Sequence, residues 1–376
     1  MVSAAVKTGK TIILVRHGLS EFNAQGRMQG SSDESLLSDI GKLTARDVGT
    51  YLNGIGVHRA VSSSLVRVKQ TAETALSLVE NSPALQLDYE LRETELYQWE
   101  GLKLIDIRKD RPEEFHAFKY DPANFSLEKN GQQVFPIRDL YQRACKFWRD
   151  NVPHFVEGNN LVVSHGGTIQ ALINTAMGLG PESHHSFQPS NCGVSCIDIV
   201  EAEIEAKDSV AELTYNYFTL KQLNNTVPLG EKLPKLKAGK EGVRLLYYPV
   251  DEALRGADLE SLSGLSSIDV VFRHVSIAVD SDSEMESAES ITLDSRIEVL
   301  VTRVQDGSSK GRALKTFLIV APDQIVRMLL TAVSGVSEEF VESMTLHDRM
   351  LTVVHHVYSH PVPILQCVNI PVFIES

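Results

Sequence analysis

Two apolar runs of this chain end at a histidine that is followed by glycine. The first run, residues 11–16, is predicted to be a buried strand and leads directly into His17. The second run, residues 161–163, leads through a serine into His165. Ligands of open α/β sheets bind at the carboxyl ends of strands. A single histidine at a strand end is more often structural, but two in the same context favour one shared catalytic pocket.

The first half of the chain alternates between strand-like and helix-like patterns. After the strand at 11–16, the sequence predicts a helix around 38–53, a strand near 59–62 and a helix near 65–80. Such alternation favours an α/β fold, a doubly wound and mostly parallel sheet with helices on both faces. Residues 94–136 break this rhythm with polar, aromatic and proline-containing sequence.

Further motifs accompany the two histidines. They are RHG at 16–18 with Ser20 and Asn23, SSSLVRVKQTAE at 62–73, LRE at 91–93 ahead of WEG at 99–101, and SHGG at 164–167. In this order and spacing the motifs resemble the histidine phosphatase superfamily, also called phosphoglycerate mutase-like. The resemblance covers roughly residues 10–225.

The resemblance implies a role for each matching residue. The implied catalytic residues are His17, Glu93 and His165. The implied phosphate-binding residues are Arg16, Asn23, Arg67 and Gly166. In this superfamily the equivalent of residues 94–136 is an insertion that caps the pocket and helps to choose the substrate.

Elementary chemistry agrees with these roles. Phosphoryl transfer needs fixed donors around the equatorial oxygens and a nucleophile in line with the leaving oxygen. Arg16 and Arg67 suit the first task, because a guanidinium offers a planar, permanently charged fork to phosphate. A neutral ring nitrogen of His17 suits the second, through a phosphohistidine. His165, if protonated, would add positive charge, and Glu93 would protonate the leaving alkoxide and then activate water.

No step of this chemistry requires a metal or another cofactor. The chain has no Cys/His cluster with zinc spacing and no EF-hand loop. The adjacent pairs His184-His185 and His355-His356 suit a shared metal poorly, because neighbouring side chains on a regular element diverge. We therefore expect no cofactor.

Composition limits the class of partner. The chain has 376 residues, 43% of them hydrophobic, and a net charge of −13, which argues against nucleic acid or an anionic membrane. No apolar run approaches the roughly 20 residues of a membrane span. Four cysteines without a disulfide framework favour a reducing compartment. A small phosphorylated molecule is the expected partner, and the oligomeric state is not predicted.

The length allows two domains. We predict a catalytic domain at 1–228, with the cap insertion at about 94–136, a linker at 229–241, and a second domain at 242–376. The second domain reads as a degenerate copy of the first without its catalytic residues. The alternative is that two α/β units look alike because they share a periodicity.

The predicted correspondence between the two copies runs through two strands. Residues 243–249 match 12–18, which puts Tyr247 at the place of Arg16 and Tyr248 at that of His17. Residues 317–322 match 161–166, which puts Ala321 at the place of His165. Such residues cannot support the same chemistry. The acidic, serine-rich segment 280–287 is predicted to be an exposed loop of the second copy.

The region after the glutamate motif bears on the substrate. Mutases of the superfamily carry His-Tyr-Gly where this chain has TEL at 94–96, and Gly-Glu-Ser where it has PIR at 136–138, so hydrolysis is favoured. Segments such as DPANF at 121–125 and SNCGVS at 190–195 resemble a plant and algal branch, the 2-carboxyarabinitol 1-phosphate phosphatases, which remove a Rubisco inhibitor. Arg138 would then pair with the substrate carboxylate, and the alternative is an ordinary surface arginine.

Two other functions stay open at this point. One is a phosphoglycerate mutase or a fructose-2,6-bisphosphatase-like enzyme, and the other is a non-catalytic binding protein on a phosphatase scaffold. The plant and algal resemblance implies work in the chloroplast stroma after removal of a transit peptide. Otherwise a cytoplasmic location is expected.

Overall fold

The computed structural model describes residues 9–199, 218–236, 241–250, 270–273 (backbone only), 314–332, 335–357 and 363–371. The chain divides into two compact units. The first comprises Met1–Pro234 with Ser343–Thr345, and the second comprises Lys235–Glu342 with Leu346–Ser376. The predicted acidic loop at 280–287 lies outside the described residues.

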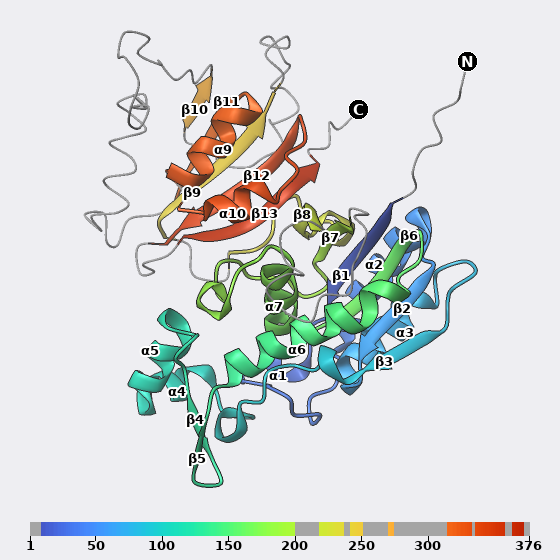
Figure 1. Ribbon diagram of the computed structural model, residues 1–376, viewed down its shortest axis with the longest axis vertical. Coiled ribbons are helices and arrows are strands. Elements are labelled where there is room, and N and C mark those ends of the chain that lie inside the picture. Colours follow the sequence, from blue (N-terminus) through green and yellow to red (C-terminus); the bar gives the residue numbers. More distant parts are fainter. Residues whose placement is uncertain are drawn as a thin grey trace. The chain divides into compact units, whose positions relative to one another are not determined.

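The sheet of the first unit is mixed and mostly parallel (Figure 1). Its described strands follow the order β8-β7-β1-β6-β2-β3. Their bounds are β1 (Lys10–Arg16), β2 (Arg59–Ser63), β3 (Leu85–Asp88), β6 (Gly158–Ser164), β7 (Val194–Ile199) and β8 (Phe218–Asn225). Strands β1, β6, β2 and β3 run parallel, and β7 and β8 are antiparallel to their neighbours. The predicted α/β class is confirmed.

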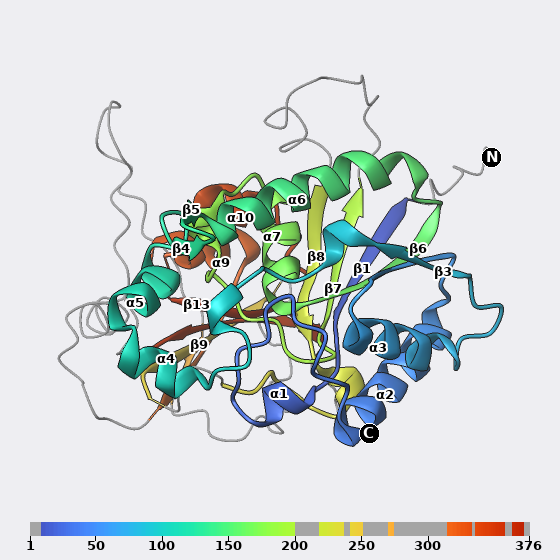
Figure 2. The ribbon, with the colours of Figure 1, turned by 90° about the horizontal axis from the view of Figure 1, so that it is seen from below.

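The middle of the central strand β1 is a continuous apolar run because both faces of the sheet are covered. Ile12, Ile13, Leu14 and Val15 are at most 1% exposed, as expected for a strand with helices on both sides. Ile13 and Val15 pack into one cluster with residues of α2 (Asp39–Ile55) and α3 (Val66–Leu76). Figure 2 shows α6 (Pro136–Asn151) on the opposite side of the sheet from α2 and α3.

Local sequence explains where the main helices begin and end. Ser38 caps α2 by accepting a hydrogen bond from the Gly41 amide, and Gly56, with φ 71°, ends it. Proline at the first position starts α6, whose apolar stripe from Ile137 to Trp148 is buried. Helix α7 (Gly166–Ala176) packs against α6. Helix α1 (Glu21–Ala24) is a single turn, and η3 (Val152–His154), η4 (Pro181–Ser183) and η6 (Val227–Leu229) are 3-10 turns.

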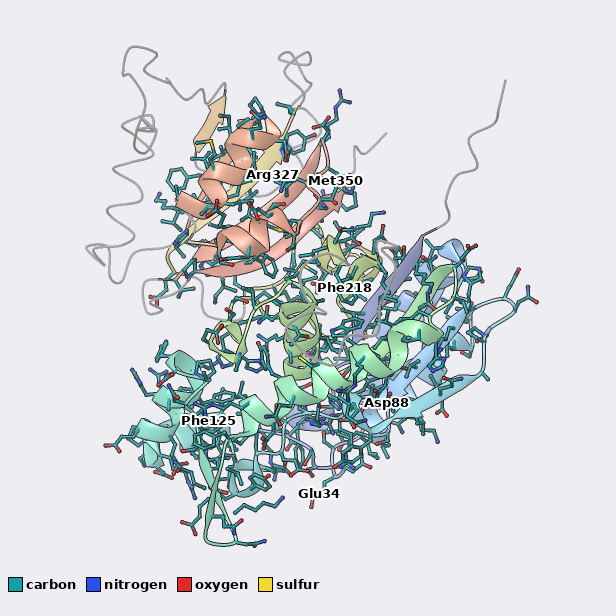
Figure 3. All side chains as sticks on the ribbon, in the orientation of Figure 1. Glu34, Asp88, Phe125, Phe218, Arg327 and Met350 are labelled. Atoms are coloured by element: carbon teal, nitrogen blue, oxygen red, sulfur yellow. The ribbon has the colours of Figure 1, made fainter. Side chains whose placement is uncertain are left out.

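The predicted cap insertion has its own small core. It follows the turn η1 (Tyr89–Leu91) and contains η2 (Tyr97–Trp99), α4 (Leu104–Asp110), α5 (Pro112–Tyr120), β4 (Leu127–Lys129) and β5 (Gln132–Val134). Trp99 is fully buried, its ring contacts those of Phe118 and Phe125, and its indole N–H donates to Glu114 Oε2 at 3.0 Å. Phe125 lies within this group of short elements (Figure 3).

The second unit pairs its strands in a similar order. The described strands are β9 (Val243–Pro249), β10 (Val270–Arg273), β11 (Lys315–Ala321), β12 (Met350–His356) and β13 (Ile364–Pro371), in the order β10-β11-β9-β12-β13. Its described helices are α9 (Asp323–Ala332) and α10 (Glu338–Glu342). Strand β9, like β1, lies between a parallel neighbour that leads into a helix and an antiparallel neighbour.

The register of this sheet corrects the predicted correspondence. The amide of His17 donates to Ser164 O at 2.9 Å, and the amide of Val250 donates to Ala321 O at 3.1 Å. Val250 therefore stands where His17 stands, and Ala321 stands where Ser164 stands. The prediction was wrong by two residues in β9 and by one in β11, because two apolar strands can be aligned in several registers without a loss of hydrophobic pattern.

The same register places the remaining strand-end residues. Pro249, opposite Ala321 in the ladder, takes the place of Arg16, so neither Tyr247 nor Tyr248 occupies a catalytic position. Pro322 takes the place of His165, since each residue's carbonyl accepts the first helical hydrogen bond of the helix that follows.

Helices in the described part of the chain are all too short or too polar to span a membrane.

Candidate active site

The two histidines of the strand-end motifs meet at one edge of the sheet. Strands β1 and β6 are adjacent and parallel, with Arg16 opposite Ser164, so the residue after each strand emerges at the same place. The ring centroids of His17 and His165 lie 5.3 Å apart with the planes at 67°. Both side chains are buried, at 2% and 0% exposure. The structure thus brings these two residues together as the sequence predicts.

The hydrogen bond of His17 defines which ring nitrogen can react. Its Nδ1 lies 2.7 Å from the carbonyl oxygen of Gly18. A carbonyl can only accept, so Nδ1 carries the proton and the lone pair is on Nε2. The imidazole is therefore held as the tautomer that a nucleophile at Nε2 requires.

His165 is held as the opposite tautomer. Its Nδ1 lies 3.2 Å from Nη2 of Arg67, which can only donate, and its Nε2 lies 2.9 Å from Ser63 Oγ. Burial lowers the pKa of His165 well below its ordinary value, and Arg67 and His17 lower it further. The sequence leaves open a protonated His165, whereas the bond that Arg67 donates to Nδ1 and the lowered pKa favour the neutral ring.

Two guanidinium groups, that of the buried Arg67 and that of the half-buried Arg16, lie next to this pair. Nη1 and Nη2 of Arg67 donate to the carbonyls of Ser32 at 2.7 Å and Gly30 at 2.8 Å, and Nη1 of Arg16 donates to Pro189 O at 2.8 Å. Burial lowers the pKa of Arg67 to about 10, which still leaves it charged at neutral pH. Among the described residues, the Nε atoms of both arginines are buried without a hydrogen-bond partner. An oxyanion would satisfy these two donors.

Glu93 lies at the N-terminus of helix α7. Its Oε2 accepts from the Gly167 amide at 3.0 Å, and its Oε1 accepts from the Thr94 amide at 3.0 Å. A Cβ at position 167 would lie 2.6 Å from Oε1, so only glycine permits this approach. The carboxylate acts electrostatically on both Arg16 and Arg67, raising their pKa against the effect of burial. Glu93 thus joins the four residues described above.

The other two predicted phosphate ligands flank this group. Gly166 opens α7, and a Cβ there would lie 3.3 Å from Arg16 Nε, so the arginine passes directly over this backbone. Asn23 is half-buried, and its Oδ1 accepts from Asn191 Nδ2 at 3.2 Å.

The described side-chain contacts of Arg138 are all with residues of the predicted cap insertion. Its side chain is exposed, its Nε donates to Ala123 O, its Nη2 donates to Asn124 Oδ1 at 2.7 Å, and its guanidinium stacks 4.5 Å from the Phe135 ring centroid. These bonds tie it to the cap and not to the residues at the strand ends. Its role toward a substrate carboxylate stays a prediction.

Arg143 is a site residue that sequence reasoning missed. From α6 its Nη1 donates to the carbonyls of Glu90 at 3.1 Å and Arg92 at 2.7 Å, and its Nη2 donates to that of Glu93 at 3.2 Å. It therefore holds the backbone that carries the Glu93 carboxylate. No sequence motif predicts this role, because the acceptors are main-chain oxygens that every residue has.

Glu100 is a second residue whose role the sequence motifs do not indicate. Its Oε1 accepts from the amide and hydroxyl of Ser31 at 2.8 and 3.1 Å and from the Leu96 amide at 3.1 Å. It thereby orders the loop whose carbonyls at Gly30 and Ser32 hold Arg67. Gly30 has φ 53°, and a Cβ there would overlap the Glu100 carboxylate.

The adjacent histidine pairs show no sign of a metal site. Burial lowers the pKa of His184 to about 3, and His185 Nε2 lies 2.7 Å from Phe118 O. Within the ranges that the structure describes, no three His, Cys, Asp or Glu side chains are grouped so as to hold a metal ion.

Comparison with known proteins identifies the family. Residues 12–210 match the model of the histidine phosphatase superfamily (branch 1). The chain is 38% identical over 195 residues to a probable 2-carboxy-D-arabinitol-1-phosphatase of Arabidopsis thaliana, covering 52% of this chain and 39% of that protein. It is 31% identical over 257 residues to the 2-carboxy-D-arabinitol-1-phosphatase of Triticum aestivum, covering 68% of this chain and 48% of that protein.

A bacterial relative is covered almost completely. The probable phosphoglycerate mutase GpmB of Salmonella typhi is 28% identical over 202 residues, covering 54% of this chain and 90% of that protein. By contrast, the chain spans less than half the length of the two plant proteins. The range 12–210 contains Arg16, His17, Arg67, Glu93 and His165, and the resemblance to the superfamily expected from the motifs is confirmed. The chain belongs to the histidine phosphatase superfamily.

Proposed function

We propose that this protein hydrolyses a phosphomonoester through a phosphohistidine formed at Nε2 of His17. One observation carries the proposal: an imidazole with its lone pair on Nε2 lies beside the guanidinium groups of Arg16 and Arg67, each with a buried Nε that has no partner among the described residues. Leaving two such donors unsatisfied costs about 1–3 kcal/mol each. A bound phosphoryl group would supply the missing acceptors.

The first step transfers the phosphoryl group to the enzyme. Nε2 of His17 attacks phosphorus, the bond to the leaving oxygen breaks, and Glu93 in its protonated form gives its proton to the alkoxide. The bond from Nδ1 to Gly18 O stabilises the cationic ring that forms. Arg16 and Arg67 stabilise the charge on the equatorial oxygens, because their donors are already held in place.

The second step releases phosphate. Glu93, now a carboxylate, takes a proton from water, the water oxygen attacks phosphorus, and the bond to Nε2 of His17 breaks. A phosphate dianion next to His165 favours the protonated form of that ring, so this histidine would gain charge when phosphate binds. Neither step needs a metal.

We propose a sugar-acid phosphate, such as 2-carboxyarabinitol 1-phosphate, as the substrate class. The names of the two plant relatives support it, as do the residues at 94–96 and 136–138 that differ from the mutase pattern. Arg138 would meet the carboxylate. In a plant or alga, removal of a Rubisco inhibitor in the chloroplast stroma would follow.

A mutase activity is the second candidate. The match to the bacterial protein named as a probable phosphoglycerate mutase extends over 90% of that protein. A mutase returns an isomerised phosphoester, whereas a phosphatase releases inorganic phosphate. The two are therefore separated by the products of one reaction with 3-phosphoglycerate.

We also propose that the second unit is a degenerate copy of the first, with a structural role. The shared strand order and the matching bonds of His17 and Val250 support this. At the places of Arg16, His17 and His165 it carries Pro249, Val250 and Pro322, none of which can bind or attack phosphate.

The proposed activity is tested by trapping the intermediate. The protein is mixed with p-nitrophenyl phosphate and with a panel of sugar phosphates that includes 2-carboxyarabinitol 1-phosphate, with and without chelator. Alkaline quenching, which preserves phosphohistidine, followed by mass spectrometry should locate the phosphate on His17. His17→Ala should abolish turnover, and His58→Ala, at an exposed histidine before β2, should not. Full turnover by His17→Ala, or inhibition by the chelator, would contradict the proposal.

A further inference from the structure

We propose that Asn191 is a positioning residue that fixes the orientation of two groups: the imidazole of His17, which is the proposed nucleophile, and the side-chain amide of Asn23. It belongs to the segment Pro189–Gly193, here called the clamp loop, which precedes β7. This inference rests on the proposed phosphatase activity and extends it to a residue that does not itself touch the phosphoryl group.

The side-chain Nδ2 of Asn191, which carries two hydrogens, lies within hydrogen-bond distance of three acceptors. This nitrogen lies 3.0 Å from the carbonyl oxygen of His17, 3.3 Å from that of Gly18 and 3.2 Å from Oδ1 of Asn23. The two carbonyls can only accept, so they fix the orientation of the Asn191 amide. That orientation then fixes the next amide, since Asn23 must turn its Oδ1 toward Asn191.

Two consequences follow for the reacting groups. First, Nδ2 of Asn23 is directed away from Asn191, and among the described residues it has no hydrogen-bond partner, which leaves a donor for a phosphate oxygen. Second, the carbonyl of Gly18 is the same one that accepts from Nδ1 of His17 at 2.7 Å. Asn191 thus holds the acceptor that keeps the lone pair of His17 on Nε2.

The backbone of the clamp loop also holds Arg16. Pro189 O accepts from Arg16 Nη1 at 2.8 Å, and the Cys192 amide donates to Arg16 O at 3.0 Å. Cys192 adopts a left-handed conformation with φ 57°. From β8, Oδ1 of Asn224 accepts from the Ser190 amide at 2.7 Å and fixes the start of this turn.

The second unit repeats the loop but not the amide. Oδ1 of Asn369 accepts from the His347 amide at 3.0 Å, as Asn224 does from that of Ser190. The Arg349 amide donates to Pro249 O at 2.9 Å, and Arg349 has φ 59°, as Cys192 has. Asp348 therefore stands at the place of Asn191.

Comparing the two loops shows whether Asn191 shapes the loop itself or orients the neighbouring side chains. The loop keeps its conformation in a unit that has valine in place of His17, so its shape does not depend on an asparagine at the position of Asn191. The amide is present in the unit where a histidine and Asn23 need to be oriented. We conclude that Asn191 serves these neighbours and not the loop.

The test compares Asn191→Asp with Asn53→Asp. Asn53 uses its Oδ1 to accept from the Glu80 amide, so aspartate keeps that bond, whereas aspartate at 191 loses a donor and faces three acceptors. We expect Asn191→Asp to lower kcat/KM about 100-fold and to weaken inhibition by inorganic phosphate, with an unchanged melting temperature. Asn53→Asp should leave both kcat/KM and the inhibition constant of inorganic phosphate unchanged.

Coupling to Asn23 distinguishes positioning from a general structural role. In an Asn23→Ala background the loss caused by Asn191→Asp should shrink, because one of the groups that it orients is gone. An Asn191→Asp enzyme within about twofold of an active wild type would overturn the inference, and so would an equal loss in both backgrounds with unchanged phosphate inhibition. Asn191→Ser gives the same comparison should the aspartate variant fail to fold.

An inactive wild type would instead contradict the proposed function. In that case, calorimetric titration with inorganic phosphate still tests Asn191, because phosphate binding alone requires the Asn23 amide. Equal affinity of the wild type and Asn191→Asp would then overturn the inference.

Discussion

Nη2 of Arg67 lies 3.2 Å from Nδ1 of His165, so one buried side chain of the site donates a hydrogen bond to another. The guanidinium is fully buried, and two backbone carbonyls take its other described bonds. This contact joins β6 to α3 and keeps positive charge at the place where the phosphoryl group is proposed to bind.

Replacing Arg67 by lysine should show how much the fork geometry matters. A lysine keeps the charge, but its single nitrogen cannot reproduce the separated donors with which Arg67 contacts Gly30, Ser32 and His165 together. We expect Arg67→Lys to lower kcat/KM about 10²–10³-fold, as for the loss of one oriented donor. Steady-state kinetics would check this, with Arg46→Lys on the exposed face of α2 as the control. A loss of less than about threefold would show that charge alone suffices.

Removing the acid from Glu93 should affect substrates unequally. An alkyl phosphate needs its leaving oxygen protonated, whereas p-nitrophenolate leaves without help. Glu93→Gln should therefore lower kcat about 10²–10⁴-fold for a sugar phosphate and much less for p-nitrophenyl phosphate. Glu128→Gln, at an exposed position of β4, is the control. Equal losses on the two substrates would contradict proton donation by Glu93.

Adding one methyl group at Gly167 should displace the same carboxylate. A Cβ there would lie 2.6 Å from Glu93 Oε1. We expect Gly167→Ala to lower kcat/KM about 100-fold through misplacement of Glu93. Gly54→Ala, where a Cβ would meet nothing within 4 Å, should leave activity unchanged. An active Gly167→Ala enzyme would mean that the carboxylate does not need its present position.

Acid should destabilise the first unit through His184. Burial lowers the pKa of this ring from 6.5 to about 3. Between these values the unfolded chain binds a proton that the folded chain does not, so stability is full above pH 6.5 and falls as the pH drops toward 3. The slope from this group is about 1.4 kcal/mol per pH unit.

This dependence can be measured by urea unfolding followed by tryptophan fluorescence. Both tryptophans of the chain, Trp99 and Trp148, belong to the first unit. His184→Gln should flatten the decline of the free energy of unfolding below pH 6.5, while His116→Gln, at an exposed site on α5, should not. An unchanged slope in His184→Gln would exclude this histidine as the cause.

Arg138 offers a direct test of the proposed substrate class. Arg138→Ala should lower kcat/KM for a carboxylated sugar phosphate by about tenfold and leave a neutral sugar phosphate unaffected, because only the first has a second anion to pair. The exposed Arg149→Ala on α6 is a suitable control. Equal losses on both sugars would remove the carboxylate role, in keeping with the bonds that tie Arg138 to Ala123 and Asn124.

The sequence predicted the parts of the fold that depend on local pattern. The buried strand before His17, the helix capped by Ser38 and the adjacency of the two strand ends all follow from hydrophobic periodicity and from the rule for parallel sheets. Contacts that depend on backbone atoms could not be predicted in this way. Arg143 and Asn191 act on main-chain carbonyls, which leave no trace in the residue types of their partners.

The predicted register of the second unit was wrong for a related reason. Tyr247 and Tyr248 look like substitutes for Arg16 and His17 when the strands are compared as strings. Only the ladder to β11 shows that Pro249 and Val250 occupy those places. Strands covered on both faces read as continuous apolar runs, so a shift of one residue in β11 or of two in β9 leaves the hydrophobic pattern intact.

The carboxylate of Glu100 lies within the insertion that is expected to select the substrate, yet it orders the loop that holds Arg67. A change in this insertion that alters the choice of substrate can therefore also alter the position of Arg67. A chimera that receives this insertion from another superfamily member should retain turnover only where the donor sequence supplies an acceptor facing residues 30 and 31. Changes in substrate selectivity that arise in this insertion are limited in the same way, to those that keep an acceptor in this position.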